Sequence, residues 1–532
     1  MRQWMRTKRL TLAFLLILPV AAASAETLAD IDAEIQTNKT FKADRGGLAA
    51  YNIYEGVTTS RLDRKIAILK AAGVSTWFYQ YGSGATNYEN FHSFTSLAGV
   101  TDTAVALITP SDNLRLYRRG KTGTIETSTR LGAWWSPAYR GVEATRNDLA
   151  ILKAWGSDLQ RIYVIDLPAG QTLVGGLASP MEKDGEYRPG GGYQYYYNGA
   201  QNSWLVYALY ATDYLQSYAG AVTSAQRIGW NMAADVGLQL NRIRWQNGGG
   251  APRMAGRKEP ASDGFWVRAF GGNSSYTEMD GSSVDARTQG FSIGWHRLAE
   301  EDVLHERRSY FGVLLSQGQD RQNYGSQVAN RTEATVGGLY GMRIDKPAGP
   351  RTSYTHLSLL HGGVIWRNSV PGEIAGTGLT QDYRGRMTVI SLEQGITFHQ
   401  KYGWVLEPQL QFSYAAVRHG AFQDNVGALV ALRQGDAVWA RLGIEARRTL
   451  TGADGYQSAC WGRLSYFHRF SLANEVDVSG DKAVSESEWQ RLQLGVGADW
   501  RLGRQWYLQG EVTKGISGDR GLSGNLSWKY VW

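Results

Sequence analysis

The sequence holds one cysteine and 12 prolines among 532 residues. Because Cys460 has no second cysteine to pair with, an intramolecular disulfide is excluded, and stability must come from packing and from hydrogen bonds between strands. His92 has no second histidine or cysteine at the spacing of a metal site, so we expect no bound metal. Residues 26–202 also contain neither a nucleotide P-loop nor a nucleophile elbow.

Long apolar runs are also missing, except near the N-terminus. Residues 1–25 have a basic start, an apolar run over residues 10–20 and the small-residue sequence Ala23-Ser24-Ala25. This pattern predicts a cleaved secretory signal peptide, because the run is too short for the alternative, a transmembrane anchor. No other segment of the sequence could cross a membrane as a helix, so any membrane role must come from β-strands.

Acidic residues are absent before Glu26, so the four basic residues of this segment supply half of the formal net charge of the chain. The formal net charge is +8, of which Arg2, Arg6, Lys8 and Arg9 supply four charges. The remaining excess is too small to predict a nucleic-acid partner.

Glycine and aromatic residues are abundant, with 64 glycines, 19 tryptophans and 29 tyrosines. The last stretch has Leu526, Trp528, Tyr530 and Trp532 at every second position, with mostly polar residues between them. This period of two predicts a strand with one apolar face. An exposed strand of this kind would aggregate in water, so we interpret it as the closing strand of a barrel that faces lipid.

Residues 263–532 contain twelve segments of roughly the 9–11 residues that a tilted membrane strand needs. The predicted strands are residues 265–272, 289–297, 309–317, 330–344, 353–366, 387–399, 404–419, 438–449, 459–470, 489–500, 505–513 and 521–532. Residues 320–325 and 370–385 are predicted external loops. The even strand number and the unequal loops predict a 12-stranded antiparallel transmembrane β-barrel, whereas a soluble β-sandwich does not explain the aromatic end.

Residues 203–262 are predicted to form a pore helix followed by a linker. Apolar residues between positions 222 and 243 recur at steps of three and four, which is a helical period. About 25 residues would reach roughly 37 Å, enough to pass through an outer-membrane barrel. The alternative is a helix that packs against the preceding domain. Gly248 starts a triple glycine that ends the helix, and residues 251–262 are a polar linker.

The barrel region resembles the translocator domain of pertactin-type autotransporters along essentially its whole length. The resemblance rests on motifs in the same order, among them W-V-R-A-F-G at residues 266–271, Q-G-F-S-I-G-W at 289–295, Y-G-W-V-L-E-P-Q at 402–409 and the aromatic end at Trp532. It implies a Gram-negative outer-membrane protein that moves the upstream part of the chain, the passenger, to the cell surface. It also implies insertion into outer-membrane lipid by the barrel-assembly machinery, which recognises the last strand.

Charged residues inside the predicted strands fit a wet lumen better than contact with lipid. Five residues are expected to line the pore: Glu407, Gln409, Arg441, Glu445 and Arg463. Some autotransporters cut the passenger free at an Asn-Asn pair in the pore helix. Here Asn231 and Asn241 stand alone, so we expect the passenger to stay tethered.

Residues 26–202 are predicted to form a small exported α+β domain. Residues 60–72 and 147–155 are predicted helices, and residues 103–108, 114–118 and 161–167 are predicted strands. The domain lacks a repeat of about 20–30 residues, unlike the long β-helices that pertactin-type passengers commonly form.

Short motifs in this domain could bind a nucleotide. Arg118, at the end of a predicted strand, could hold a phosphate with both arms of its guanidinium. Trp135, or its neighbour Trp134, could stack on a planar ring. Three further residues, Gly190, Gly191 and Gly192, would let the backbone approach a ligand closely.

The order of these motifs resembles toxin domains of the ADP-ribosyltransferase and NAD-glycohydrolase superfamily, in particular the tuberculosis necrotising toxin family. The resemblance covers residues 114–197 and implies that Gln194 is catalytic and that Arg118 anchors a phosphate of NAD. ADP-ribosyltransferases usually have a glutamate where Gln194 falls, and an amide cannot act as a general base. NAD hydrolysis is therefore favoured over transfer to protein, and Glu186 is a carboxylate that could be recruited.

Two other functions stay open for the passenger region. The glycines could be only a turn and the tryptophans only a core pair, in which case the passenger is a surface adhesin or binds a host-cell target. The contacts would then come from the aromatic residues of positions 193–197 and from Trp204. A porin with a plug is the third alternative, and it predicts ion conductance without surface exposure before residue 202.

Overall fold

The computed structural model describes two compact units, residues 1–109 with 172–179 and residues 110–171 with 180–532. In the first unit it describes only the strands named below and Ala178. In the second it describes all residues except 111, 122–130, 133, 180, 198, 248–262, 279–280, 326, 346–350, 452–456, 471–472, 487–489 and 504. The predicted signal peptide, the predicted helix over residues 60–72 and the linker lie outside the described residues.

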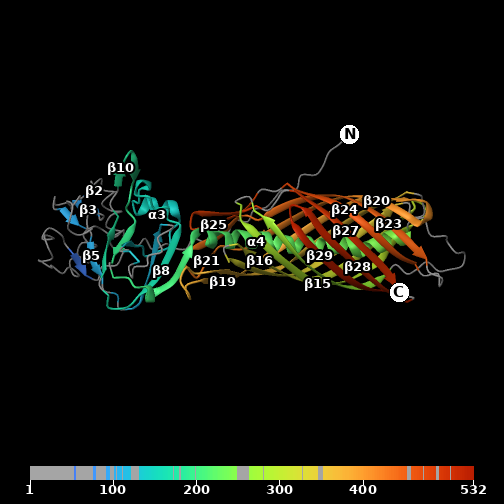
Figure 1. Ribbon diagram of the computed structural model, residues 1–532, viewed down its shortest axis with the longest axis horizontal. Helices are drawn as coiled ribbons and strands as arrows, with labels where there is room; N and C mark the ends of the chain where they lie inside the picture. The colour runs from blue at the N-terminus through green and yellow to red at the C-terminus, as the bar shows by residue number, and fades with distance from the viewer. Residues whose placement is uncertain are drawn as a thin grey trace, which may run out of the picture. The chain divides into compact units, whose positions relative to one another are not determined.

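Twelve antiparallel strands form a closed barrel in the C-terminal half, as predicted (Figure 1). The strands are β14 (Gly264–Thr277), β15 (Ser283–Asp302), β16 (Arg307–Tyr324), β17 (Ala329–Asp345), β18 (Arg351–Val370), β19 (Leu379–His399), β20 (Trp404–Arg418), β23 (Asp436–Thr451), β24 (Gln457–Arg469), β27 (Gln490–Arg501), β28 (Trp506–Ser517) and β29 (Arg520–Val531). The terminal strand β29 pairs with both β28 and β14, so Gly264 lies opposite Val531 and the barrel has no free edge.

Most strands are longer than predicted, at their polar ends. β16 continues to Tyr324, so most of the loop predicted over residues 320–325 belongs to a strand. β19 starts at Leu379, which leaves residues 371–378 as the actual loop within the predicted range 370–385. Apolar alternation marks only the part of a strand that faces lipid. Beyond that part the ladder continues between polar residues, and the alternation cannot locate the strand end.

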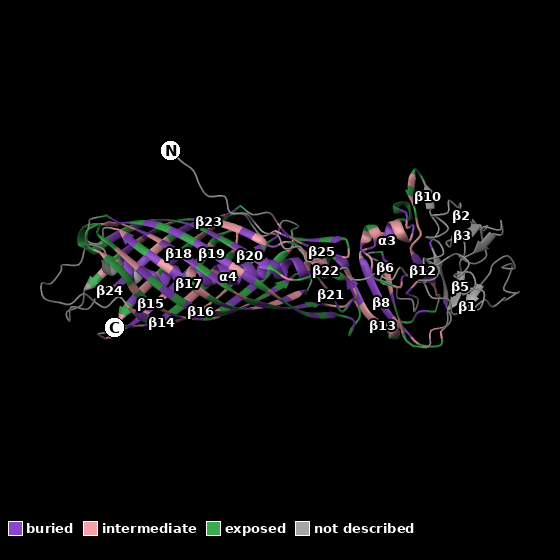
Figure 2. Cartoon of the chain, turned by 180° about the vertical axis from the view of Figure 1, so that it is seen from behind, coloured by how far each residue is buried: buried purple, intermediate pink, exposed green. Residues whose placement is uncertain are grey.

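Buried and exposed residues alternate along the strands of the barrel wall (Figure 2). In β20, Glu407 and Gln409 are buried towards the interior, whereas Leu406, Leu410 and Phe412 are exposed on the outer face. Polar residues inside and apolar residues outside are what a barrel in lipid requires.

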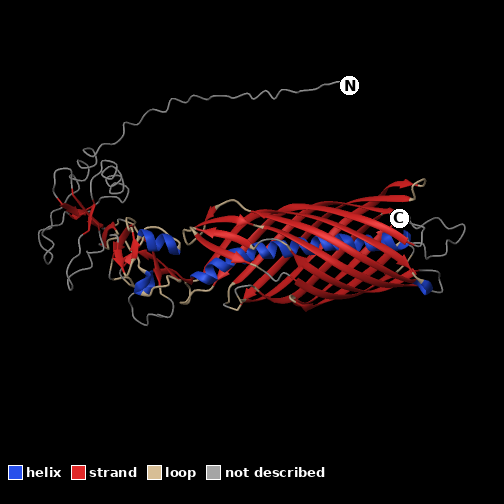
Figure 3. Cartoon of the chain, turned by 90° about the horizontal axis from the view of Figure 1, so that it is seen from above, coloured by secondary structure: helices blue, strands red, loops and turns tan. Residues whose placement is uncertain are grey.

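One long helix, α4 (Ala211–Asn247), runs through the interior of the barrel (Figure 3). Its 37 residues reach about 55 Å at 1.5 Å per residue. Ile228, Met232 and Val236 are fully buried in the same core as side chains of the barrel wall. None of the helices in the described part of the chain is both long and apolar enough to cross a membrane.

The pore helix predicted at the start of residues 203–262 begins later than expected, at Ala211. Residues 205–210 form β13 (Leu205–Tyr210), which pairs with β8 (Arg161–Leu167). Val206 and Tyr207 are residue types that favour a strand, and the partner strand β8 is available beside them.

Two hairpins extend the barrel at the end where α4 begins. β21 (Phe422–Gln423) and β22 (Leu429–Gln434) lie between β20 and β23 in the sequence, and β25 (Asn474–Val478) and β26 (Asp481–Ser485) lie between β24 and β27. They form one four-stranded sheet in the order β21-β22-β25-β26. Val430, Val476 and Val478 of this sheet are buried in the same core as Tyr218 of α4.

The N-terminal part of the second unit combines short strands with short helices, in agreement with the predicted α+β class. β6 (Leu114–Gly120), β8 and β13 form one sheet. Around it lie β7 (Trp134–Trp135), α3 (Val142–Asp148), η2 (Lys153–Trp155), β10 (Met181–Lys183), β11 (Glu186–Arg188), β12 (Tyr193–Tyr196) and η3 (Asn202–Trp204). The helix predicted over residues 147–155 was wrong, because α3 ends at Asp148 and the positive φ of 53° at Ala150 breaks the helical path.

The first unit contains two small groups of strands. β1 (Ile53–Glu55) pairs in parallel with β5 (Val105–Ile108), and β5 pairs antiparallel with β9 (Leu173–Leu177). β2 (Thr76–Phe78), β3 (His92–Thr95) and β4 (Thr101–Thr103) form the second group. The side chain of His92 lies outside the described residues.

Candidate functional site

Three residues of the predicted nucleotide site, Arg118, Trp135 and Gln194, lie on three neighbouring strands. Tyr117 of β6, next to Arg118, exchanges two backbone hydrogen bonds with Ser136, with N···O distances of 2.9 and 2.7 Å. One residue earlier, Trp135 of β7 lies opposite Tyr195 of β12. The fold therefore puts Arg118, Trp135 and Gln194 on adjacent strands.

The two faces of the β7–β12 pair carry different members of the predicted site. Trp135 faces the same side as its partner Tyr195, so Gln194, the next residue along β12, lies on the opposite side. Trp134 lies opposite Tyr196 and shares the face of Gln194, and the Trp134 and Tyr196 rings are 5.0 Å apart. Trp134 is therefore the tryptophan that shares a face with Gln194, which is 4% exposed, whereas Trp135 is a core residue with 1% of its surface exposed.

The triple glycine docks on the end of α3. The Gly190 N–H donates to the Asn147 carbonyl at 2.9 Å, and the Gly192 N–H donates to the Asp148 carbonyl at 2.7 Å. A side chain at Gly192 would collide with Asp148, and Gly191 has a φ of +84°. These glycines are required by the turn itself, which uses the N–H groups of Gly190 and Gly192.

The two arginines at the end of β6 have different surroundings. Arg118 is partly buried, lies over Gly132 and donates from Nη1 to the Leu131 carbonyl. Arg119 is buried and donates to the Tyr139 hydroxyl at 2.6 Å and to the Asp481 carboxylate. Arg118 is therefore the arginine of this pair that can meet a ligand.

Glu186 is already engaged by its own neighbours. Its carboxylate accepts the Lys153 N–H at 2.8 Å and the Arg188 Nε–H at 2.8 Å. Desolvation opposes the shift, but these bonds hold the pKa of Glu186 below its ordinary value. Glu186 is thus an ionised structural carboxylate that ties β11 to η2.

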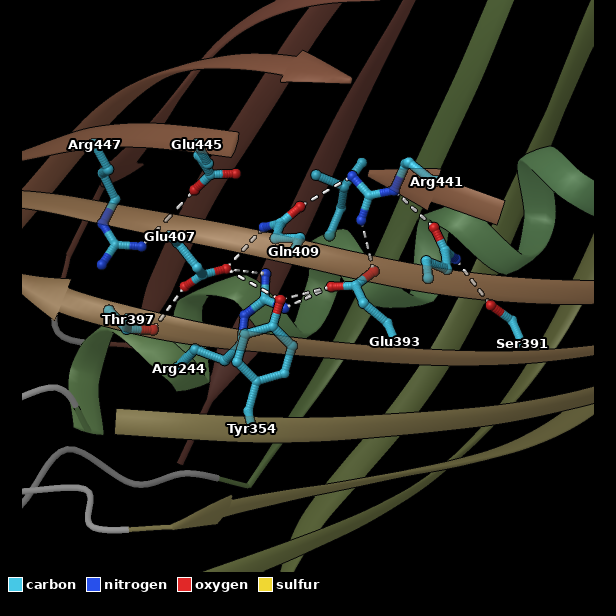
Figure 4. A network of polar contacts seen from close by, with 12 residues as sticks. Arg244, Tyr354, Ser391, Glu393, Thr397, Glu407, Gln409, Arg441, Glu445 and Arg447 are labelled. Carbon is cyan, nitrogen blue, oxygen red and sulfur yellow. Dashed lines mark hydrogen bonds and ion pairs between the residues drawn. The ribbon is translucent and has the colours of Figure 1, made fainter. Parts of the chain in front are cut away.

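A second cluster of charged side chains lies inside the barrel, near the C-terminal end of α4 (Figure 4). Arg244 donates to Glu393 at 2.9 Å and pairs with Glu407 at 3.3 Å, and its guanidinium lies 4.0 Å from the centre of the Tyr354 ring. The Tyr354 hydroxyl donates to both carboxylates, at 2.8 and 3.2 Å. The helix is therefore held to β18, β19 and β20 by one shared ionic contact.

Arg441 of β23 extends this network along the wall. It donates to Gln411 at 2.8 Å, to Gln409 at 2.9 Å and to Glu393 at 2.9 Å. All five residues predicted to line the lumen lie on its inner side: Glu407, Gln409, Arg441, Glu445 and Arg463. A cavity of about 150 Å³ beside α4 is lined by Arg441, Arg463 and Asn231, among others.

Comparisons with known proteins assign the barrel to a family. Residues 265–513 match the family model described as the autotransporter β-domain. The pertactin autotransporter of Bordetella parapertussis is 25% identical over 279 residues, which is 52% of this chain and 29% of that protein. The barrel of this chain is a pertactin-type autotransporter β-domain. The chain thus spans less than a third of the curated relative that it matches.

Two solved structures also match parts of this chain. The β-domain of the Bordetella autotransporter BrkA covers 51% of this chain and 99% of that chain, with 23% identity and a TM-score of 0.41. The structure of Tne2 in complex with Tni2 covers 18% of this chain and 82% of that chain, with 18% identity and a TM-score of 0.16.

An autotransporter β-domain resides in the Gram-negative outer membrane, with its passenger at the cell surface. The outer face of this barrel suits that environment. Trp506, Trp528 and Tyr530 are in ring contact at one end of the barrel, with the rings of Trp506 and Trp528 stacked 4.3 Å apart. Aromatic side chains of this kind form the girdle at the membrane–water interface.

The passenger part of the autotransporter is joined to the barrel hairpins by buried charges. Asp481, at the start of β26, accepts a hydrogen bond from Arg119 and one from the Val142 N–H, the latter at 2.6 Å. Val142 is the first residue of α3, whose own cap residue provides no side-chain bond. Asp481 therefore caps this helix from the barrel side and neutralises Arg119 at the same time.

A second contact joins the passenger to the loop between β18 and β19. Arg161 of β8 pairs with Glu373 of this loop. The Ala208 N–H donates to the Thr377 carbonyl at 3.2 Å, and the Glu373 N–H donates to the Ala208 carbonyl at 2.8 Å. Burial raises the pKa of Glu373, although Arg161 opposes the shift. At a third point, Asp424 before β22 accepts hydrogen bonds from Tyr214 and Tyr218 of α4.

These three acidic residues were missed from the sequence. Asp424 and Asp481 stand in turn sequences, where an aspartate is expected for local reasons. Their partners lie more than two hundred residues earlier in the chain. A pattern of neighbouring residues holds no signal for such a pairing.

Proposed function

We propose that this autotransporter exports a small passenger and keeps it seated on the barrel hairpins as an NAD-consuming domain. The display part rests on the continuity of the chain, because β13 of the passenger leads directly into α4 inside the barrel. The contacts made by Asp481 and Glu373 support a seated passenger rather than a loosely tethered one. Insertion through the barrel-assembly machinery, guided by the strand that ends at Trp532, belongs to the same proposal.

The NAD-consuming part rests on one observation, the pairing of β7 with β12 beside β6. This arrangement puts Trp134, Tyr196 and Gln194 on one face. In the proposed reaction, Arg118 holds a phosphate of NAD and Trp134 stacks on a ring of the substrate. Gln194 orients the ribose or the attacking water. The water oxygen bonds to the ribose carbon, nicotinamide leaves with the electrons of the broken bond, and a proton passes to solvent.

The test follows nicotinamide release by the full-length protein in detergent, with NAD supplied. Gln194→Ala should lower the rate by about a hundredfold, which is typical for the loss of a group that positions reactants. Gln201→Ala is the matched control, because Gln201 is an exposed glutamine of the same region. A folded wild-type protein that releases no nicotinamide, or a Gln194→Ala protein as fast as the control, would contradict the proposal.

A binding function remains the second candidate for a specific reason. Trp155 of η2 and Tyr187 of β11 are 50% and 59% exposed, and the bond between Lys153 and Glu186 holds their two elements together. By contrast, Tyr193 and Tyr195, part of the predicted contact surface, are buried. If the passenger is an adhesin, Trp155→Ala with Tyr187→Ala should abolish attachment of cells to a host surface, and Gln194→Ala should not affect it.

A further inference from the structure

The outer face of the barrel carries a row of arginines at the end near the passenger. The strand register puts Arg287 of β15 opposite Arg321 of β16, Arg321 opposite Arg331 of β17, and Arg331 opposite Arg367 of β18. Four guanidinium groups from four consecutive strands therefore lie side by side. We call these four residues the arginine row.

The arginine row faces outwards and not into the lumen. Its residues alternate along their strands with buried residues such as Gln322, Asn330 and Asn368. The side chains of Arg331 and Arg367 are 39% and 56% exposed. On β16 the same face continues through Gln319 and Gln317 to the exposed apolar residues of the lipid-facing wall.

The position of the arginine row along the barrel follows from its contacts with α4. Asn330, next to Arg331, lies beside Gly220, and Asp320, next to Arg321, accepts a hydrogen bond of 2.7 Å from Ser224. Both helical residues belong to the first half of α4, near the passenger. The row therefore lies at the cell-surface end of the barrel, on the side of the outer leaflet.

Like charges directly opposite each other destabilise a sheet unless an opposite charge lies between them. Arg367 pairs with Asp382 at 2.6 Å, and Arg331 pairs with Glu333 at 2.6 Å. With the Gln319 amide turned so that its oxygen faces the two arginines, Arg321 and Arg331 both donate to that oxygen, at 2.8 and 3.3 Å. Among the described residues, the structure gives no carboxylate partner to Arg287 or Arg321. The positive charge of the row exceeds what the protein itself neutralises.

Other arginines extend the positive surface around the barrel. Arg386 of β19 lies opposite Arg418 of β20, and Arg384 lies on the same outward face two residues before Arg386. Arg418 pairs with Asp436. Arginine forks match phosphate oxygens in two-point hydrogen bonds, and neighbouring strands about 4.8 Å apart let two arginines hold one phosphate.

We propose that the arginine row binds the phosphorylated sugar headgroup of lipopolysaccharide, the anionic glycolipid of the outer leaflet. The phosphates occupy the positions between neighbouring guanidinium groups, and the acyl chains lie along the apolar wall below. The headgroup site is centred on the side of the barrel formed by β15 to β18. The arginines prefer the phosphorylated lipid to its dephosphorylated form.

The experiment measures how much lipopolysaccharide stays with the full-length protein after purification in mild detergent. The row variant replaces Arg287, Arg321, Arg331 and Arg367 by Gln. Arg343, Arg351 and Arg448 are outward-facing arginines at the opposite end of the barrel, and the replacement of these three by Gln gives the control for position along the barrel. The row variant should retain about tenfold less lipid, a change that the loss of one charge-assisted contact is enough to cause, and the control should retain the wild-type amount.

A second arm identifies the recognised chemistry. Lipopolysaccharide, its enzymatically dephosphorylated form and inorganic phosphate are each added to delipidated wild-type protein. The proposal predicts tight binding of the first, weak binding of the second and no displacement of the lipid by the third. Equal retention by the row and control variants, or equal binding of the two lipid forms, would overturn it. If the fourfold variant does not fold, Arg287→Gln with Arg321→Gln serves instead, because these two arginines have no carboxylate partner to strand.

Discussion

The two ends of α4 are held inside the barrel by different chemistry. Near its C-terminal end, Arg244 is buried between Glu393 and Glu407 and stacked on Tyr354. Near the passenger, α4 makes its hydrogen bonds through uncharged side chains: Tyr214 and Tyr218 donate to the Asp424 carboxylate, Gln226 and Asn474 exchange hydrogen bonds of 2.9 and 3.0 Å, and the Thr223 and Ser485 hydroxyl oxygens are 2.7 Å apart. The charged end cannot move without leaving carboxylates in the lumen unpaired, whereas water can replace the neutral bonds. The charged contact therefore fixes the helix, and the neutral contacts only align it.

Arg244→Ala is the substitution for which we expect the largest loss of stability. Removing one partner of a buried ionic cluster costs about 3–5 kcal/mol, because the charges left behind stay buried. We expect a marked loss of stability, measured by urea unfolding of the barrel followed through tryptophan fluorescence. Arg448→Ala is the control, since Arg448 is an exposed arginine of the outer wall near the same end. Equal effects of the two substitutions would refute a special role for the Arg244 contact.

An intermediate effect is expected for Asp481→Asn in the hairpin that seats the passenger. The amide keeps an oxygen for the Val142 N–H but loses the charge that faces Arg119, which is worth about 1.5–3 kcal/mol for a bond between charged groups. Hydrogen exchange in β6 and α3 should become faster while exchange in the barrel strands stays unchanged. Asp477→Asn is the control, because Asp477 pairs with the exposed Arg433 in the same hairpin. Unchanged exchange in α3 would show that the passenger is not held by Asp481.

The smallest effect should follow Gln226→Ala at the neutral end of α4. Asn474 keeps its bond of 2.8 Å to Thr223, so the loss is about 1 kcal/mol. Exchange of the amides around residue 226 should rise a few-fold, and exchange around residue 244 should not change. A loss of stability as large as that of Arg244→Ala would invert the comparison between the two ends.

The barrel was predictable because apolar and polar residues alternate along each of its strands. The alternation ending at Trp528 and Trp532 indicated a lipid-facing wall, and charged residues such as Glu407 and Arg441 could only lie on the other face. The strand ends were not predictable, since polar residues on both faces at positions such as 320–325 erase the alternation. The start of α4 was missed because residues 205–210 form β13 instead. This strand depends on its pairing with β8, which lies about forty residues earlier in the chain.

The candidate site in the passenger was predictable only as a set of residues. The sequence shows that Trp134 and Trp135 point to opposite sides of a strand, but only the pairing with Tyr195 and Tyr196 tells which one shares a face with Gln194. The triple glycine was predicted to approach a ligand, whereas two of its N–H groups are bonded to the end of α3. The partnership of Arg119 with Asp481 joins distant parts of the chain, and no local pattern encodes it.

The central claim is that the passenger stays on the same chain as the barrel, seated at the cell surface. It is tested by the intact mass of the protein from outer membranes, combined with labelling of whole cells at a cysteine placed at Tyr187, with the exposed Cys460 replaced by Ser. The account predicts one polypeptide that carries both the surface label and the barrel. A separate barrel fragment that begins within α4, or a cysteine at position 187 that cannot be labelled on intact cells, would contradict it.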